Sequence, residues 1–500
     1  MGCWIRAIAL VCGLMGLLGS QAALAAPNPA KLQLKSGSAL VMDVNTGKTL
    51  YQKNPTRVRP IASLTKLMTA SPAPAYLTRT QERALAVTVA VVTANAYYIH
   101  PIIGEVARAY GVGEAEIGLV PALNQLALAL GILLLLPLGD FYPNRRLCLI
   151  FVAGQTLSLG GMVLAPSFAL FTAASTALGF FTIAPYLIPA FASKRVAPER
   201  LGQVTAKLTA AVILGILVAR VSAGIIAERA DWHTVYIGAF VLMAAVTAFL
   251  PIAMRSEAAA PKQTKARYGA LIASVFTLAA KNPDMRISAA IQGLNFGIFT
   301  ASWLSLALHL TSPAMGYGTD DVGYLAGVAA ISVFTTPRLG RWADRVGARK
   351  ARLVAAIVNL AGIALYYPLG FSIWSLLVPL LLANMVGPSI DVTGRMTLFT
   401  LAPDIRTRLT TFYIVVMFVG GAIGSALGTA VYDWGGWGAT CALKISAIAE
   451  IFFVSRMPPE RPSAAQLRAT LAAPPGLSST RSILTTGTGA SGEMRCTSPN

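Results

Sequence analysis

Long apolar runs separated by short polar segments occupy most of the chain, beginning near residue 84. About 20 apolar residues in a helix span the hydrocarbon core of a bilayer, so each run predicts one transmembrane helix. Six runs lie at about 84–107, 115–138, 147–166, 168–192, 203–227 and 234–254. Six more lie at about 286–310, 321–339, 351–370, 373–397, 408–432 and 437–455, the last interrupted by Lys444 and Glu450. The pattern predicts an all-α membrane protein with 12 transmembrane helices in two bundles of six.

A polar, basic stretch separates the two sets of runs and divides the chain. We therefore predict an N-terminal six-helix bundle at 83–254, a basic cytoplasmic linker at 255–285 and a C-terminal six-helix bundle at 286–455. A polar tail at 456–500 is expected to be disordered.

The basic residues of the loops predict how the helices are oriented. They fall on alternate sides of successive helices, at Arg145 and Arg146, Lys194 and Arg195, 255–285, 341–352, and Arg406 and Arg408. Cytoplasmic loops carry the excess of Lys and Arg, so both ends of the 12-helix body are expected in the cytoplasm. This pattern is typical of a multi-pass protein of the bacterial inner (plasma) membrane, in contact with lipid.

Composition supports this class and excludes others. The chain is 55% hydrophobic and 12% charged, whereas soluble domains carry about 25% charged residues. Its net charge of +20 comes from short loops rather than from a charged surface, so we expect no nucleic-acid partner. The five cysteines show no metal-ligand spacing, and the sequence contains no phosphate-binding Gly-x-x-x-x-Gly-Lys loop. We predict a non-enzymatic protein with no cofactor and no metal.

The first 82 residues have a different character from the rest. Residues 1–26 resemble a secretory signal, with Arg6, an apolar run at 7–18 and small residues at 23–25. Residues 27–82 are polar, and two alternating segments around a turn at 45–47 predict a strand pair. We therefore expect a short signal-plus-strand N-terminal extension.

A serine and a lysine in this extension suggest a second chemistry. Ser63 and Lys66 are three residues apart, so on a helix they share a face and the lysine can activate the serine hydroxyl. With the strand at 39–43, they resemble the start of a penicillin-binding D-alanyl-D-alanine peptidase. The chain lacks the Lys-Thr-Gly element of that family, and its one Ser-x-Asn is at 498–500. We interpret 27–82 as a truncated peptidase-like fragment and linker, with a periplasmic serine peptidase as the alternative function.

The extension and the helical body predict opposite orientations. A working signal carries residues 27–82 out of the cytoplasm, whereas the basic loops place the start of the first helix inside it. A fused or misassembled reading frame explains the conflict, and we expect residues 1–82 to lie outside the functional unit.

The two predicted bundles share an internal repeat. In the loops after the second and eighth helices, Asp140 aligns with Asp344, and Arg145-Arg146 aligns with Arg349-Lys350. Parallel repeats of this kind are typical of transporters in which two bundles rock about a central site.

The loop motif also resembles that of the major facilitator superfamily, over about residues 83–455. The second loop fits well at Gly340, Asp344, Arg345, Gly347 and Arg349, whereas the first has Leu136 where the leading Gly is expected. Segments 93–101, 119–121 and 214–220 look like a bacterial drug-efflux-like branch.

The resemblance implies a secondary active transporter, proton-coupled, that exports a small organic solute or drug as a monomer. A solute importer of the same fold is the alternative. It also implies a conformational latch in the two loops, formed by Asp140, Arg145, Arg146, Gly340, Asp344, Arg345, Gly347 and Arg349. The competing interpretation is that these residues are solvated loop charges that only set orientation.

Polar residues inside the predicted helices are the candidates for transport itself. A carboxylate within an apolar span marks a functional site by default, so we predict that Asp391 couples transport to protons. Arg395, one turn later, can instead hold Asp391 in a structural ion pair. Arg220 either extends to the lipid headgroups or serves as a gate or substrate counter-charge. In the family, helices one, four, seven and ten line the cavity, which adds Asn95, Tyr98, Tyr186 and Asn295, within a wider polar set that includes Tyr97 and His100.

Small residues recur on the eleventh predicted helix at Gly420, Gly424 and Gly428. Such spacing lets helix backbones approach closely. The stripe indicates either a sliding contact that permits rocking or an ordinary helix–helix contact.

Overall fold

The computed structural model describes residues 39–42, 49–53, 76–193, 195–254, 267–399 and 403–456. The chain forms two compact units, 1–73 and 74–500. In the first unit, β1 (Ala39–Met42) pairs antiparallel with β2 (Thr49–Lys53), and Val41 lies opposite Tyr51. The strand pair predicted around the turn is therefore present. The signal-like segment 1–26 and residues Ser63 and Lys66 lie outside the described residues.

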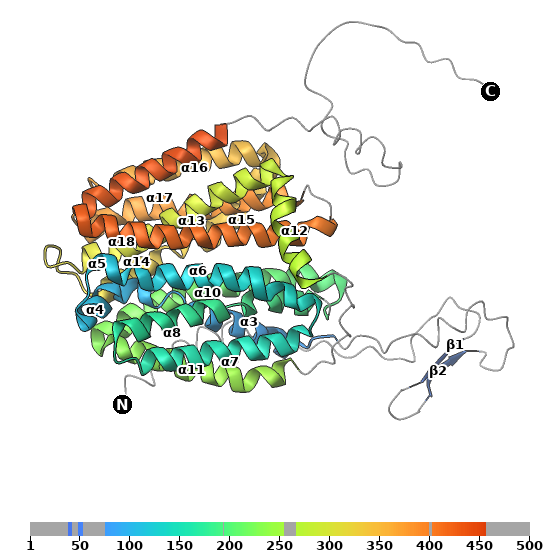
Figure 1. The fold of residues 1–500 in the computed structure, drawn as a ribbon. Coiled ribbons are helices and arrows are strands. Elements are labelled where there is room, and N and C mark those ends of the chain that lie inside the picture. The colour runs from blue at the N-terminus through green and yellow to red at the C-terminus, as the bar shows by residue number, and fades with distance from the viewer. Residues whose placement is uncertain are drawn as a thin grey trace, which may run out of the picture. The chain divides into compact units, whose positions relative to one another are not determined.

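In the second unit, all regular elements of the residues that the structure describes are helices (Figure 1). Its first half comprises α3 (Arg79–Ala94), α4 (Ile99–Tyr110), α5 (Glu114–Ile117), α6 (Leu119–Leu135), the 3-10 helix η2 (Leu136–Asp140), α7 (Asn144–Val163), α8 (Phe168–Phe181), α9 (Ala184–Ser193), α10 (Pro198–Arg229) and α11 (Trp232–Ala253). The remainder comprises α12 (Tyr268–Ala280), α13 (Pro283–Leu310), α14 (Thr319–Val328), α15 (Ile331–Val346), α16 (Ala348–Leu365), α17 (Ile373–Phe399) and α18 (Pro403–Arg456).

Nine helical stretches of the described residues are long and apolar enough to cross a membrane. The last of them, Ile405–Ser455, contains two predicted spans, because Gly436 leaves the helical conformation at φ 62° and ψ −156°. Such a positive φ is accessible to glycine at little cost. The runs predicted at 321–339 and 351–370 form α14, α15 and α16, which are not among the nine. All twelve predicted runs thus overlap helices, and the count of twelve spans stays a prediction.

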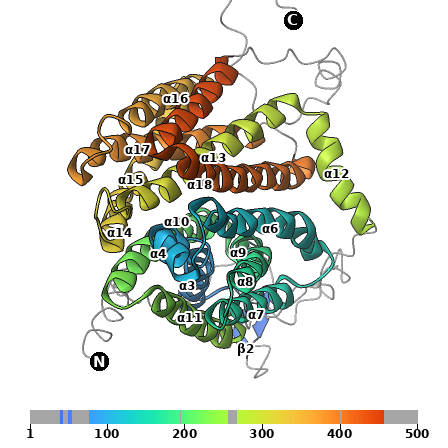
Figure 2. The ribbon, with the colours of Figure 1, turned by 60° about the vertical axis from the view of Figure 1, so that its left-hand side comes forward.

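The helices pack as two groups (Figure 2). In the first half, α3 lies along α10, and α8 lies between α6 and α7. In the second half, α13 packs along α18, and α16 and α15 pack along α17. One large hydrophobic core and a second, smaller cluster near α16 and α17 fill the spaces between these helices.

Contacts between the halves include those of α6 and α5 with α18, α10 with α14, and α4 with α13. Helices α4, α5 and α14 share one end of the unit, whereas α12 lies toward the other (Figure 1). The helices α3 and α15, which continue the spans of α4 and α14, pack mainly within their own halves. The α10–α14 and α4–α13 contacts therefore join the halves at the α4–α14 end.

The glycine stripe of α18 packs inside the second half. A Cβ on Gly420 would lie 2.1 Å from the carbonyl oxygen of Gly293, and one on Gly424 would lie 2.2 Å from that of Gly297. A Cβ on Gly428 would lie 2.7 Å from Cα of Ala301. The stripe thus brings the backbones of α13 and α18 together in register, and we interpret it as a contact that holds one half together.

Candidate functional site

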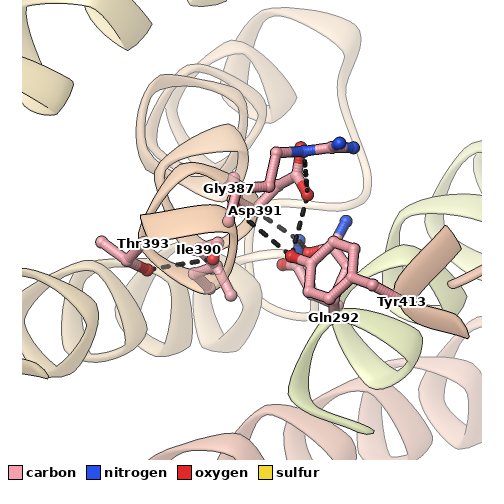
Figure 3. Close-up of polar contacts among 8 residues, drawn as sticks. Gln292, Gly387, Ile390, Asp391, Thr393 and Tyr413 are labelled. Carbon is pink, nitrogen blue, oxygen red and sulfur yellow. Dashed lines mark hydrogen bonds and ion pairs between the residues drawn. The ribbon is translucent and has the colours of Figure 1, made fainter. Parts of the chain in front are cut away.

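Asp391 lies on α17 in a hydrogen-bonded ion pair. Arg395 Nε donates to both carboxylate oxygens, at 3.0 and 2.9 Å, and the two side chains are one helical turn apart. The Tyr413 hydroxyl of α18 donates to Oδ1 at 2.9 Å, and Figure 3 shows Asp391 and Tyr413 facing each other. The side chains of Arg395 and Asp391 keep 37% and 27% of their surface exposed, so the pair is not sealed into the core.

Asn295 joins this group from α13. Its Nδ2 donates to Gln292 Oε1 and to the carbonyl oxygen of Gly387, both at 3.3 Å. Pro388, next to Gly387, lacks an N–H and interrupts the helical hydrogen bonding just before Asp391. Asn295 thus contacts α17 one turn before Asp391, and Asp391 contacts Arg395. The role of these three residues in transport stays a prediction.

Arg220 lies on α10 and is 1% exposed. Its guanidinium carbon lies over three aromatic rings, 5.3 Å from the centroid of Tyr97, 4.8 Å from Phe299 and 4.4 Å from Trp303. Its Nη2 is 3.1 Å from Nδ1 of His100. The prediction that Arg220 extends to the lipid headgroups is therefore wrong. The aromatic faces and the imidazole hold the charge inside the protein instead.

The surroundings of Arg220 come from both halves. Tyr97 and His100 lie at the α3–α4 junction, whereas Phe299 and Trp303 lie on α13. Within the described ranges, no carboxylate forms an ion pair with Arg220. In the same residues, Arg220 Nε has no hydrogen-bond partner.

Aromatic side chains connect Arg220 with the Asp391 group. Phe296 stacks on Phe299 at 5.6 Å between ring centroids and meets Phe418 edge-on at 5.5 Å. Phe418 in turn meets Tyr186 of α9 at 6.3 Å. Tyr186 lies near enough to Asp391 and Arg395 to interact with their charges. We define the aromatic layer by the residues Tyr97, Tyr186, Phe296, Phe299, Trp303 and Phe418.

Two predicted transport residues point elsewhere. Asn95 Nδ2 lies 3.4 Å from Sδ of Met243 on α11, so its amide faces the interior of the first half. Tyr98 is buried in the hydrophobic core. The α3–α4 junction brings Tyr97 and His100, rather than these two, to Arg220.

The sequence reasoning missed the contributions of Phe299, Trp303, Tyr413 and Phe418. Aromatic residues in an apolar span resemble ordinary core or lipid-facing positions, so no local pattern distinguishes them. The available signal was the spacing of 296, 299 and 303, which places these aromatic residues along one face of a helix.

The two predicted latch loops occupy equivalent connections. Asp140 ends η2 before α7, whose first turn holds Arg145 and Arg146. Asp344 and Arg345 lie in the last turn of α15.

The second latch loop turns at a glycine. Gly347 connects α15 to α16 at φ 89°, a conformation that favours glycine. Arg349 Nε then donates to the carbonyl oxygen of Ser455, at 3.4 Å. Gly340 lines a small open pocket among α15, α16 and α17.

Lys444 lies in a second cage of aromatic rings, inside the second half. The lysine is 1% exposed, and its Nζ lies 4.7 Å from the ring centroid of Tyr366 and 4.4 Å from that of Trp437. Trp437 stacks on His309 with centroids 4.3 Å apart. In the sequence, Lys444 only interrupted the last apolar run.

A buried acid stabilises the start of the first helix. Glu82 is 2% exposed and pairs with Arg200 at 2.5 Å and with Lys207 at 3.4 Å, both on α10. Thr78 and Gln81 form a capping box at the N-terminus of α3. The structure thus begins α3 at Arg79, so the boundary expected between 82 and 83 falls inside a helix.

Comparison with known proteins matches the helical unit to one family. The family described as Major Facilitator Superfamily matches residues 85–403 and 287–487. An uncharacterised transporter named YgaY, from Escherichia coli O157:H7, is 27% identical over 71% of this chain and 90% of its own length. The transporter SCO4007 of Streptomyces coelicolor is 28% identical over 72% of this chain and 83% of its own length.

Solved structures share the fold at low identity. A mutant of the nucleoside transporter NupG has a TM-score of 0.60 and 12% identity, covering 75% of this chain and 98% of its own. A bacterial homologue of the human lysosomal transporter Spinster, inward-facing and occupied, has a TM-score of 0.58 and 14% identity. It covers 75% of this chain and 92% of its own.

The N-terminal extension matches a different family. D-alanyl-D-alanine carboxypeptidase matches residues 23–88. The D-alanyl-D-alanine endopeptidase of Pseudomonas aeruginosa is 67% identical over 42 residues, which is 8% of this chain and 14% of that protein. The peptidase-like segment is therefore a small part of both.

Proposed function

Because the chain belongs to the Major Facilitator Superfamily, we propose that this transporter exports a small organic solute across the inner membrane, driven by protons. The single observation that carries the proposal is the Asp391 group. A carboxylate is held by Arg395 and Tyr413 of the second half, near enough to Tyr186 of the first half to interact with it electrostatically. We further propose twelve spans in two halves of six, with both ends of the body in the cytoplasm.

The distribution of charge supports an assignment of the two ends of the helical unit to the cytoplasm and the outside. The η2–α7 and α15–α16 connections carry the basic latch residues, so we place them in the cytoplasm. The α4–α14 end is then the outer end. There, Glu228 Oε2 accepts from the backbone N–H of Thr319 at 2.9 Å and from its hydroxyl at 3.2 Å, which links α10 to α14. The joined outer end corresponds to an inward-facing state.

Asp391 is suited to couple the proton to this cycle. As a carboxylate it accepts from Arg395 and Tyr413, whereas its protonated form loses the charge that holds the arginine. Freed from Asp391, Arg395 can reorient beside Tyr186. Proton binding and the relative position of the halves are thereby linked.

Asp391→Asn tests the coupling. A growth panel of toxic organic solutes in cells expressing the chain identifies the solute, and proteoliposomes with or without a pH gradient measure its net transport. We expect the variant to accumulate and bind solute normally but to lose gradient-driven transport, because the amide imitates the neutral acid. Asp284→Asn, at an exposed carboxylate, is the matched control and should behave as wild type. Full, pH-dependent transport by Asp391→Asn would contradict the proposal, and sensitisation of cells rather than resistance would indicate import.

We propose that the two cytoplasmic loops with Asp140 and Asp344 form the conformational latch. Asp140 and Asp344 occupy equivalent connections beside basic residues, which supports a role in holding the halves in one state. We expect Asp344→Asn to lower transport severalfold at normal abundance, because it removes a charge without a change in volume. Initial rates and membrane abundance of Asp344→Asn and Asp140→Asn measure this effect. Unchanged rates in both variants would leave these residues as solvated loop charges.

A further inference from the structure

Arg220 is a buried cation that no carboxylate neutralises in the part of the chain that the structure describes. Burying a charge without an opposing charge costs free energy in a medium of low dielectric constant. The rings of Tyr97, Phe299 and Trp303 offset part of that cost through their π faces. They offer no acceptor to the N–H groups at the edge of the guanidinium.

Two donors beside this cage lack acceptors. A neutral His100 that accepts from Arg220 at Nδ1 carries its proton on Nε2. Neither this Nε2 nor Arg220 Nε has a hydrogen-bond partner among the described residues, and both side chains belong to residues that are 1% exposed. Buried donors without acceptors are costly, so an occupant with acceptor oxygens would be stabilised here.

We infer that Arg220 binds the anionic group of the transported solute, and that the solute is a small organic anion with an aromatic or apolar body. The inference rests on the proposed transport function and names its substrate class. A carboxylate supplies two acceptor oxygens in the planar geometry that a guanidinium matches. The rings of Phe296 and Phe299, which are only partly buried, offer apolar surface to the rest of the solute.

The two arginines of the central region differ in what they are able to bind. Asp391 already occupies the Nε of Arg395 through both carboxylate oxygens. Arg220 instead leaves its Nε free of protein partners among the described residues. Of these two arginines, Arg220 is the one whose Nε is left for an acceptor of the solute.

The position of the cage connects binding with the movement of the halves. Tyr97 and His100 belong to the first half, and Phe299 and Trp303 to the second. Phe296 and Phe299 are only partly buried and continue toward Phe418. A solute bound at Arg220 contacts both halves, so separating them at this point weakens its binding.

Paired probes test the charge requirement directly. The melting temperature of the purified full-length chain is measured with benzoate or naphthoate and, for comparison, with their amides. Chloride serves as the inorganic anion control, and the ionic strength is kept constant. We expect the carboxylates to stabilise wild type saturably, and the amides and chloride to have no such effect. Arg220→Gln should weaken the apparent affinity for the carboxylates by about tenfold or more, since it removes hydrogen bonds to a charged group. Arg220→Lys should bind at an intermediate level, because it keeps the charge but loses the planar fork.

Lys444→Met is the matched control, because Lys444 is also buried under aromatic rings but lies inside the second half. Its carboxylate affinity should equal that of wild type. The inference would be overturned if amides stabilised the protein as well as carboxylates, if chloride alone stabilised it, or if no carboxylate did. It would also be overturned if Arg220→Gln bound the carboxylates with the affinity of wild type. The comparison of carboxylate with amide needs only wild type, so it decides the question even where Arg220→Gln does not fold.

Transport separates this inference from the proposed function. Gradient-driven transport of a neutral or cationic solute, with no carboxylate binding, would overturn the anion site and leave the proposed transporter intact. Carboxylate binding without any gradient-driven transport would support the anion site and contradict the proposed transport function.

Discussion

The charged side chains inside the helical unit are stabilised in different ways. Arg395 has a carboxylate and a tyrosine ring, Arg220 has three rings and an imidazole, and Lys444 has two rings. Only the first arrangement provides an opposite charge. The other two leave a cation whose burial is offset by weaker interactions, and their positions separate them: Arg220 lies between the halves, whereas Lys444 lies within one.

Lys444→Met should not destabilise the protein. The thioether side chain has a similar length, and replacing a buried charge by a well-packed apolar group is often neutral or stabilising by about 1–4 kcal/mol. The melting temperature of the purified variant is therefore expected to equal or exceed that of wild type, at normal membrane abundance. A marked drop in melting temperature would show that the cation–π contacts with Tyr366 and Trp437 outweigh the desolvation of the lysine.

At the scale of the helix, glycines perform two separable tasks. Gly424 brings α18 against α13 within the second half, whereas Gly224 brings α10 against α14 across the two halves. A Cβ on Gly424 would lie 2.2 Å from the carbonyl oxygen of Gly297, and one on Gly224 would lie 2.4 Å from that of Thr319. The clashes are alike, but the first is between helices of one half and the second is between halves.

Gly424→Ala should therefore destabilise the fold. Overpacking of this kind costs about 1–3 kcal/mol, because the backbones of α13 and α18 must move apart. We expect a lower melting temperature and reduced membrane abundance. Gly238→Ala on α11 is the control, since a Cβ there meets no atom within 4 Å, and it should be as stable as wild type. Equal stability of both variants would contradict the close packing of α13 and α18.

Gly224→Ala should instead shift the balance between conformations. The added methyl group opposes closure at the α4–α14 end, so the outward-open state gains population while each half stays packed. A single cysteine introduced at Phe299 should then react faster with an impermeant thiol reagent added from outside. Labelling no faster than in the same cysteine variant with Gly224 intact would contradict the assignment of this contact as an outer closure.

At the scale of the whole chain, two compact units carry signatures of two families. The peptidase-like segment covers 14% of the Pseudomonas endopeptidase that it matches, and Lys-Thr-Gly is absent from the sequence. The helical unit contains its own helix N-cap, the Thr78–Gln81 capping box, and Glu82 anchors the first turn of α3 by pairing with Arg200. Transport is therefore expected to depend on the helical unit alone.

Two deletions test this division. Removing residues 2–75, with a start Met retained, should preserve membrane abundance and transport. Removing residues 2–82 takes away the capping box and Glu82, which leaves Arg200 and Lys207 without their carboxylate and should lower abundance. Immunoblots of membrane fractions and transport assays compare the two. Loss of transport in the shorter deletion at normal abundance would assign a function to the peptidase-like extension.

Much of the fold was accessible from the sequence, because it depends on local patterns. Helices of the second unit follow from apolar runs, since a bilayer requires each span to satisfy its backbone hydrogen bonds internally. The strand pair follows from alternation, and the family follows from the motif around Asp344 and Gly347. Asp391 and Arg220 were also recognisable, because charges are costly in apolar spans.

Tertiary structure alone decided what those charges contact. One sequence neighbour, Arg395, pairs with Asp391 through helical spacing, but Tyr413 contacts Asp391 only through the packing of α17 against α18. The packing of α9 likewise brings Tyr186 near the charges of the pair. Likewise Arg220 meets Phe299 and Trp303 from a helix of the other half. An aromatic residue in an apolar span looks the same in sequence whether it faces lipid, the core or a charge. The distinction arises from the rotation and neighbours of each helix, which depend on contacts between residues far apart in the chain.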